Sequence, residues 1–189
     1  MKQRRVSRAI QVGDVTVGGD APVTVQSMTK TDTRDVKATV RQIRELEDAG
    51  CDIIRSAVPD MEAARALRDI RRQIRIPLIA DIHFHYQLAL EALEAGVDGL
   101  RLNPGNIRDR EKVETVVRAA RERQVPIRIG VNFGSLPPVG QIGMTRGLHR
   151  HQDGVNRLAK AGEDAPGQLS AVDHMVATAL WEIGILEEL

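Results

Sequence analysis

Cysteine is almost absent from this sequence: Cys51 is the only one in 189 residues. A single thiol cannot form an internal disulfide, and it cannot by itself hold a structural zinc ion or an iron–sulfur cluster. Its surroundings, AGCDIIRSA, predict a small buried side chain at the entry to a strand. The sequence therefore excludes a fold stapled by disulfides and a metal centre built from the cysteines of this chain alone.

Two further features that the sequence lacks bear on its partners. The 27 Lys and Arg residues nearly balance the 26 Asp and Glu residues, so composition gives no reason to expect a nucleic-acid or membrane-surface partner. No stretch approaches the ~18 apolar residues of a transmembrane helix, and the basic start MKQRRVSRAI is not followed by the apolar segment of a secretory signal. We therefore expect a cytoplasmic protein that binds neither nucleic acid nor membranes.

Five short apolar segments have the length of β-strands, and each is rich in Val, Ile or Leu and bounded by Gly, Pro or Asp. They lie at residues 22–28, 51–57, 77–82, 99–104 and 126–131. Helical periodicity follows the first of them, where Val36, Val40, Ile43 and Leu46 form one apolar stripe before Gly50. The hydrophobic content of 42% is enough for a buried core.

Helical patterns also follow the later apolar segments. One helix is expected to start after Asp60 as N-cap, and others at residues 86–95, 109–123 and 171–189. The alternation of strands and helices predicts an α/β fold with a parallel sheet, because parallel strands need a crossover connection. The strands start about 22 to 29 residues apart, and no glycine-rich phosphate fingerprint follows the first, which favours a (β/α) barrel over a dinucleotide-binding sheet.

Two segments lie outside this alternation. Residues 9–18 contain two β-prone pieces around Gly13 and predict a β-hairpin before the first strand. Residues 137–170 are rich in glycine and polar residues and predict a long loop or lid. Because a closed barrel has eight strands, we predict a partial TIM (β/α)8 barrel over residues 1–189, with its first five βα units, as the N-terminal part of a longer protein.

Polar side chains gather at the predicted carboxyl ends of these strands, where ligands bind in parallel α/β folds. They are Arg55, Asp81, His83, Arg101, Asn103, Arg128 and Asn132. Residues two apart share one face of a strand, so Asp81 faces the same side as His83, and Arg101 the same side as Asn103. Arg101 and Arg128 interrupt apolar runs, where an unpaired guanidinium would be costly. Three arginines from three strands fit a ligand with several negative oxygens, such as a diphosphate.

The stretch IADIHFHY raises a second possibility, a metal-dependent barrel hydrolase built on His83 and His85. The strand pattern, however, places His83 with the polar cluster and His85 beyond the strand, exposed at the start of the next helix. No other histidine precedes residue 149, so the set of ligands for such a metal is incomplete. We favour a hydrogen-bonding role toward phosphate for His83 and no metal site.

Several motifs in order, VGDVTVGG, VQSMT, ADIHF, LRLNPGNI and RIGVNFGSL, resemble the 4-hydroxy-3-methylbut-2-enyl diphosphate synthase family over about residues 5–136. The resemblance implies a TIM barrel similar to that of dihydropteroate synthase. It also implies reductive ring opening and dehydration of 2-C-methyl-D-erythritol 2,4-cyclodiphosphate in the non-mevalonate route to isoprenoids. Ferredoxin or flavodoxin would supply the electrons, and the full-length protein would be a homodimer.

The resemblance carries over residue by residue to a substrate-binding set without a catalytic residue or a metal ligand. The set is Arg55, His83, Arg101, Asn103, Arg128 and Asn132. The family holds a 4Fe-4S cluster with three cysteines and one glutamate in a C-terminal domain, whereas no cysteine follows Cys51 here. We therefore expect the iron–sulfur domain to be absent from this chain, which would supply the diphosphate-binding barrel and be inactive alone. A catalytically inert diphosphate-binding module is the alternative.

Overall fold

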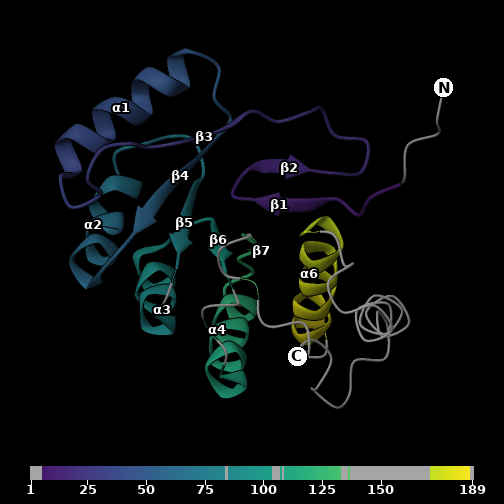
Figure 1. Ribbon diagram of the computed structural model, residues 1–189. Coiled ribbons are helices and arrows are strands. Elements are labelled where there is room, and N and C mark those ends of the chain that lie inside the picture. Colours follow the sequence, from purple (N-terminus) through teal and green to yellow (C-terminus); the bar gives the residue numbers. More distant parts are fainter. Residues whose placement is uncertain are drawn as a thin grey trace, which may run out of the picture. The chain divides into compact units, whose positions relative to one another are not determined.

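The computed structural model describes residues 6–83, 85–103, 107, 109–132, 136 and 171–187 (Figure 1). They fall into two compact units. The first is Met1–Arg101 with Ala119–Arg128, and the second is Leu102–Arg118 with Ile129–Leu189. The loop or lid predicted at residues 137–170 lies outside the described residues.

The chain begins with the predicted hairpin. Strands β1 (Ile10–Val12) and β2 (Val15–Val17) pair antiparallel. Gly13 makes the turn at φ +59°, and a Cβ there would lie 3.0 Å from both the Asp98 Oδ1 atom and the Pro77 Cγ atom. Only glycine combines that backbone conformation with so close an approach, so the turn fixes how the hairpin meets these two loops.

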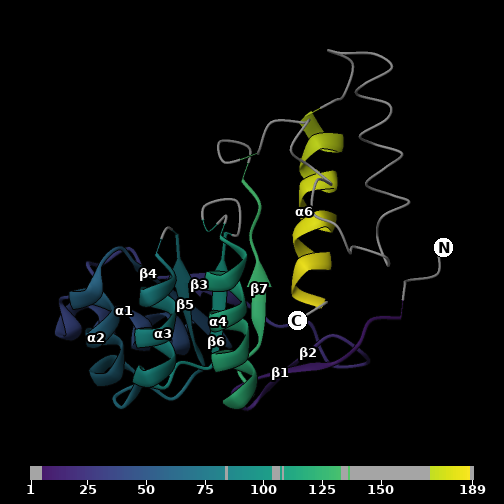
Figure 2. The ribbon, with the colours of Figure 1, turned by 90° about the horizontal axis from the view of Figure 1, so that it is seen from below.

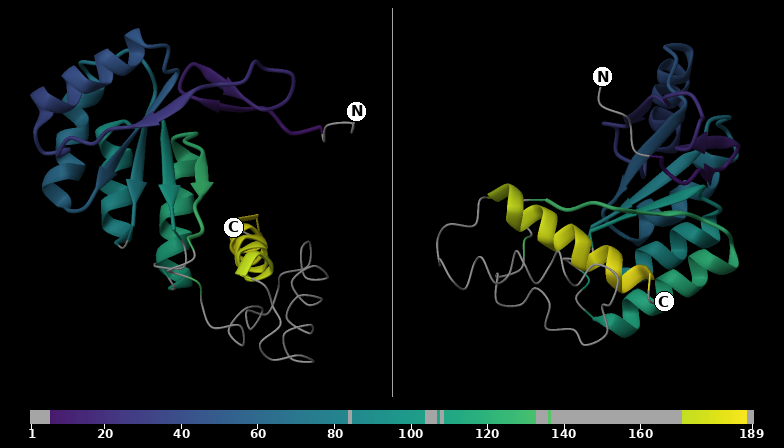
Figure 3. Two further views of the ribbon diagram at one scale, coloured as in Figure 1. Left: turned by 45° about the horizontal axis from the view of Figure 1, so that its top comes forward. Right: turned by 90° about the vertical axis from the view of Figure 1, so that its right-hand side faces the viewer.

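A five-stranded sheet follows, with its strands in sequential order. The strands are β3 (Gln26–Met28), β4 (Ile53–Val58), β5 (Leu78–Ile82), β6 (Gly99–Leu102) and β7 (Ile127–Ile129). The pairs β3–β4 and β4–β5 are parallel. Sequential order and parallel direction are what successive βα units produce, and they confirm the predicted class (Figure 3).

The first strand is shorter than predicted. It begins at Gln26 rather than near residue 22, and Val23 and Val25 are exposed. The Val25 N–H donates to the Asp52 carboxylate at 2.7 Å, and the Val25 carbonyl accepts from the backbone N–H groups of Asp52 and Ile53. The aspartate thus binds the backbone where the strand was expected to continue.

Helices occupy the predicted positions. They are α1 (Val36–Asp48), α2 (Met61–Arg71), α3 (Tyr86–Ala95), α4 (Arg110–Glu122) and α6 (Ala171–Glu187). The Asp60 carboxylate caps α2 by accepting from the Ala63 N–H at 2.9 Å, as predicted. Gly50 and Gly96 follow α1 and α3 with φ of +92° and +86°, which fits glycine after the end of a helix.

Helices α1, α2 and α3 lie side by side, and α2 and α3 pack on β4 and β5 (Figure 2). Their apolar stripes include Ile43, Leu67 and Ile70, none of which has any exposed surface. The opposite face of these strands is therefore the one available for a site. No helix in the described ranges combines the length and apolar character needed to cross a membrane.

Candidate functional site

The amino ends of the strands present an apolar layer on the face away from the helices. Ile53 of β4 and Ile79 of β5 are buried there against Val12 of the hairpin. On β6 the equivalent residue is Gly99, where a Cβ would lie 3.1 Å from Ile79 Cγ1. A cavity of about 390 Å³ lies against this layer, and Gln26 is among its few polar lining residues. The hairpin and these strands thus form an apolar floor.

Two residues further along each strand the same face becomes charged. Ile53 is succeeded by Arg55, Ile79 by Asp81 and Gly99 by Arg101. Side chains at i and i+2 share a face, and a strand rises roughly 6.6 Å over two residues. On this face the side chains therefore change from apolar to charged over two residues of each strand. The charged side chains lie toward the carboxyl ends, where ligands bind in this class of fold.

Asp81 lies between two arginines. Arg101 Nη1 donates to Asp81 Oδ1 at 3.1 Å, and Arg55 Nε lies 3.4 Å from Asp81 Oδ2. His83 Nε2 is 3.9 Å from Asp81 Oδ1. We call Asp81, Arg55, Arg101 and His83 the strand-end cluster. It contains three of the six predicted binding residues, and part of the negative charge expected beside the arginines comes from the protein itself.

Burial within the strand-end cluster is graded. The exposed fraction of the side chain is 4% for Asp81, 8% for Arg101, 23% for Arg55 and 37% for His83. The carboxylate therefore lies deepest, with the guanidinium groups and the imidazole nearer to solvent.

Arg55 is held less firmly than Arg101. Its Nε atom, although within ion-pair distance of Asp81, is buried without a hydrogen-bond partner among the described residues. Its Nη2 atom donates to Met28 Sδ at 3.3 Å, and a thioether is a weak acceptor. A phosphate oxygen would be a much stronger acceptor for this guanidinium.

Arg128 lies apart from the strand-end cluster and contacts the opposite edge of the sheet. Its Nη1 atom donates to the Gln26 Oε1 atom at 3.1 Å, which joins β7 to β3. In a flat sheet of five strands the two edges would be about 19 Å apart, at about 4.8 Å per strand spacing, farther than the two side chains can reach. The sheet is therefore curved about this face, as a segment of a barrel is.

Asn103 and Asn132 belong to the second unit. Asn103 directly follows β6 and is buried, whereas Asn132 follows β7 and is exposed. Both lie just past the carboxyl end of a strand, as predicted. Their membership of the binding set stays a prediction.

His85 is at the N-cap of α3 and is exposed, without a side-chain hydrogen bond to the helix. This position confirms the prediction that it lies at the helix start. Within the described residues no group of three or more His, Cys, Asp or Glu side chains is placed to hold a metal ion.

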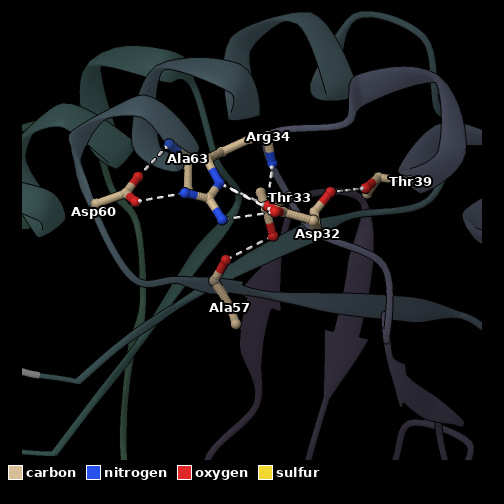
Figure 4. A network of polar contacts seen from close by, with 7 residues as sticks. All are labelled: Asp32, Thr33, Arg34, Thr39, Ala57, Asp60 and Ala63. Carbon is tan, nitrogen blue, oxygen red and sulfur yellow. Dashed lines mark hydrogen bonds and ion pairs between the residues drawn. The ribbon is translucent and has the colours of Figure 1, made fainter.

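A second charged network, which we call the rim network, lies in the loops after β3 and β4 (Figure 4). Arg34 donates to the Asp32 carboxylate through Nε and Nη2, at 2.9 and 2.7 Å, and its Nη1 atom donates to Asp60 at 3.3 Å. Thr33 Oγ1 donates to the Ala57 carbonyl at 2.7 Å. The hydrogen bonds from Arg34 lower the pKa of Asp32, and the same pairing raises the pKa of Arg34. These bonds join the first loop to the second.

Two features of the site have no direct signal in the sequence. They are the pairing of Asp81 with both Arg55 and Arg101, and the hydrogen bond from Arg55 to Met28. Both contacts depend on the register between neighbouring strands. On one side of β4 this register aligns Arg55 with Met28, and on the other side it aligns Ala57 with Asp81. Periodicity within one strand cannot supply that register.

The model of the GcpE TIM-barrel domain family matches residues 7–189. The chain is 52% identical over its whole length to a protein of Dehalococcoides mccartyi strain BAV1 and covers 47% of it. It is 63% identical over 137 residues to a protein of Thermodesulfovibrio yellowstonii, with 72% of this chain and 39% of the relative covered. Both relatives are named 4-hydroxy-3-methylbut-2-en-1-yl diphosphate synthase (flavodoxin). The chain thus spans about half the length, or less, of the curated relatives it matches.

Solved structures agree on the fold. The dihydropteroate synthase of Yersinia pestis has a TM-score of 0.52 at 12% identity, with 91% of this chain and 58% of that chain covered. The enzyme of Vibrio fischeri gives 0.53 at 12% identity, with 87% and 64% covered. At such identity the likeness concerns the fold alone. The chain belongs to the GcpE TIM-barrel domain family.

Proposed function

We propose that this member of the GcpE family is the substrate-binding part of a 4-hydroxy-3-methylbut-2-enyl diphosphate synthase. The full-length enzyme would open the ring of 2-C-methyl-D-erythritol 2,4-cyclodiphosphate by two-electron reduction and expel water. This chain would supply a partial barrel over residues 1–189 that holds the cyclic diphosphate. The names of its relatives support the reaction, and the strand-end cluster supports the binding role.

The observation that carries the proposal is the pairing of two arginines with a single carboxylate at the carboxyl ends of the strands. Arg55 and Arg101 bring two positive charges beside the carboxylate of Asp81, which pairs with both of them within the described residues. Arg128 adds a further cation on the same unit. A diphosphate has several anionic oxygens that arginine can bind by paired hydrogen bonds, so it fits these three cations.

In this proposal each side chain of the binding set has a role in holding the substrate. Arg55, Arg101 and Arg128 would neutralise the diphosphate, and His83 would donate a hydrogen bond to one of its oxygens. Asn103 and Asn132 would add neutral donors. Fixing the diphosphate would position the ring carbon for reduction and would stabilise the negative charge that remains on the substrate.

The cofactor of this reaction, a 4Fe-4S cluster, does not fit the residues of this chain. Cys51, the one cysteine of the sequence, is buried, and its Sγ atom lies 3.1 Å from the carbonyl oxygen of Ile53. Such a cluster is held mainly by several thiolates. The cluster would therefore have to be held by the part of the enzyme that corresponds to the rest of the relatives' length.

The proposed protein partners of the full-length enzyme are an electron donor and a second copy of the enzyme. The relatives carry flavodoxin in their names, so flavodoxin is the electron donor we propose, with ferredoxin as the alternative. The full-length enzyme would work as a homodimer, in which the barrel of one subunit faces the cluster domain of the other.

Substrate titration of the full-length protein tests the binding role. Arg101→Ala and Arg128→Ala should each weaken the affinity for the cyclodiphosphate by roughly ten-fold or more, as expected for loss of a charge-assisted hydrogen bond. Arg34→Ala in the rim network removes the same charge outside the strand-end cluster and serves as the matched control. Wild-type affinity in both the Arg101→Ala and the Arg128→Ala variant would refute the arginine site.

A catalytically inert diphosphate-binding module is the second candidate, because the thiol content of this chain is too low for the cluster. Iron and sulfide analysis of the purified full-length protein, together with turnover under reducing conditions, separates the two functions. Iron with turnover supports the synthase. Binding of the cyclodiphosphate without iron supports the module.

A further inference from the structure

We infer that Asp81 is the positioning residue of the diphosphate site: it fixes the orientation of Arg101 and, more loosely, that of Arg55 before the ligand arrives. The inference rests on the proposed function, since it concerns how the same site is organised. Asp81 is the one acidic member of the strand-end cluster. A carboxylate in a site for an anion needs a physical explanation, and a positioning role provides one.

Asp81 is unsuited to bind an anionic ligand itself. Its side chain is 4% exposed, less than either arginine or His83. A carboxylate would also repel the oxygens of a diphosphate. Any effect of Asp81 on binding must therefore act through the side chains that it contacts, the two guanidinium groups above all.

The contact with Arg101 is suited to orientation. Arg101 is only 8% exposed and donates to Asp81 Oδ1 at 3.1 Å. A guanidinium group is planar and carries five N–H donors in a fixed geometry, so holding Nη1 restricts the directions of all five. A long side chain that is already fixed loses less conformational entropy when it binds a ligand.

The contact with Arg55 is of a different kind. Arg55 Nε lies 3.4 Å from Asp81 Oδ2 but makes no hydrogen bond among the described residues, and Nη2 has the weak acceptor Met28 Sδ. Asp81 attracts this guanidinium without directing its donors. Arg101 is therefore the arginine through which the positioning effect should mainly act, and Arg55 can move to meet the ligand.

A positioning role and a simple counter-ion role predict opposite signs. If Asp81 only balanced charge, the neutral and nearly isosteric Asp81→Asn variant would make the site more positive and bind a diphosphate more tightly. If Asp81 orients Arg101, the same variant should bind more weakly, because an amide is a weaker acceptor and also presents donors toward the guanidinium. The sign of the change therefore decides between the two roles.

The experiment is calorimetric titration of full-length protein with 2-C-methyl-D-erythritol 2,4-cyclodiphosphate. We expect Asp81→Asn to weaken binding roughly ten-fold, the equivalent of about one charge-assisted hydrogen bond. Asp60→Asn removes one negative charge from the rim network instead and should bind as the wild type does. Unchanged or tighter binding in Asp81→Asn would overturn the inference.

A double-mutant cycle shows whether Asp81 acts through Arg101. The Asp81→Asn/Arg101→Ala variant should bind no more weakly than Arg101→Ala alone, because the group to be positioned is already gone. A merely structural role predicts that the two losses add. Additive losses would therefore contradict the inference.

A third variant covers the case in which Asp81→Asn does not fold. Asp81→Glu keeps the charge but moves the carboxylate by one methylene, so positioning predicts weaker binding, whereas a counter-ion role predicts wild-type affinity. Failure of the wild type to bind the cyclodiphosphate would refute the proposed function and this inference with it. Wild-type binding together with wild-type affinity in Asp81→Glu would refute the inference alone.

Discussion

The strand-end cluster and the rim network use the same side chains in inverse arrangements. In the cluster one aspartate lies between two arginines, and in the rim network one arginine lies between two aspartates. The Asp81 side chain is 4% exposed, whereas Arg34 is 44% exposed. The first arrangement places two cations around one buried anion, and the second places two anions around one exposed cation.

The difference in burial between the two networks gives their ion pairs different roles. Water screens the rim network, so its charges contribute little energy and its geometry mainly joins two loops. The strand-end cluster is largely shielded from water, so its charges interact strongly. Removal of one partner should therefore lower the stability of the folded protein strongly. The following predictions measure that difference on full-length protein, and they run from the largest expected effect to the smallest.

Arg101→Ala should lower the free energy of unfolding by about 3 kcal/mol, because it leaves the buried Asp81 carboxylate with the longer contacts to Arg55 and His83. Urea denaturation followed by circular dichroism measures the change. Arg41→Ala, on an exposed face of α1, removes an arginine whose side chain is 77% exposed and is the matched control. Equal stability of the Arg101 and Arg41 variants would mean that burial of the cluster has no energetic consequence.

Asp60→Ala should cost about 1 kcal/mol, because it removes the cap of α2, in which the carboxylate accepts from the Ala63 N–H. Asp60→Asn keeps an N-capping oxygen while it removes the charge, so it should retain nearly all of the stability. The same denaturation experiment applies. A loss of equal size in both variants would show that the ion pair to Arg34, and not the cap, is what stabilises this loop.

Arg34→Ala should have the smallest effect on stability, and that effect should depend on pH and salt. Hydrogen bonds from Arg34 lower the pKa of Asp32 in the folded protein. Their contribution is therefore present above the pKa that Asp32 has in the unfolded chain and is lost as the pH falls through its folded pKa. Melting temperatures of wild type and variant should converge at acidic pH and in high salt. A difference that persists under both conditions would contradict a screened ion pair.

Local patterns were enough to place most elements of the fold. The capping carboxylate of Asp60 and the glycines after α1 and α3 act on residues close to them in the sequence, so a linear pattern marks them. The start of β3 was misplaced because the group that ends its pairing, the Asp52 carboxylate, comes from a segment 27 residues away. Errors of this kind are expected wherever a distant side chain replaces a ladder hydrogen bond.

The site, like the fold, has features that a local sequence pattern predicts and features that depend on contacts between distant segments. Parity along a strand was enough to predict that His83 shares a face with Asp81 and Asn103 with Arg101, because side-chain direction repeats every two residues. Parity could not show that Asp81 binds both arginines, nor that Arg128 reaches Gln26. The first depends on the register between strands, and the second on the curvature of the sheet.

The sequence by itself thus determined the order of strands and helices, the helix caps and the face of each strand that carries charge, since each depends on residues a few positions apart. Only the tertiary structure decided that Asp81 lies between Arg101 and Arg55, and that the hairpin packs on an apolar floor formed two residues earlier on each strand. Both results come from contacts between segments distant in the chain, whose register is set by packing of the sheet as a whole.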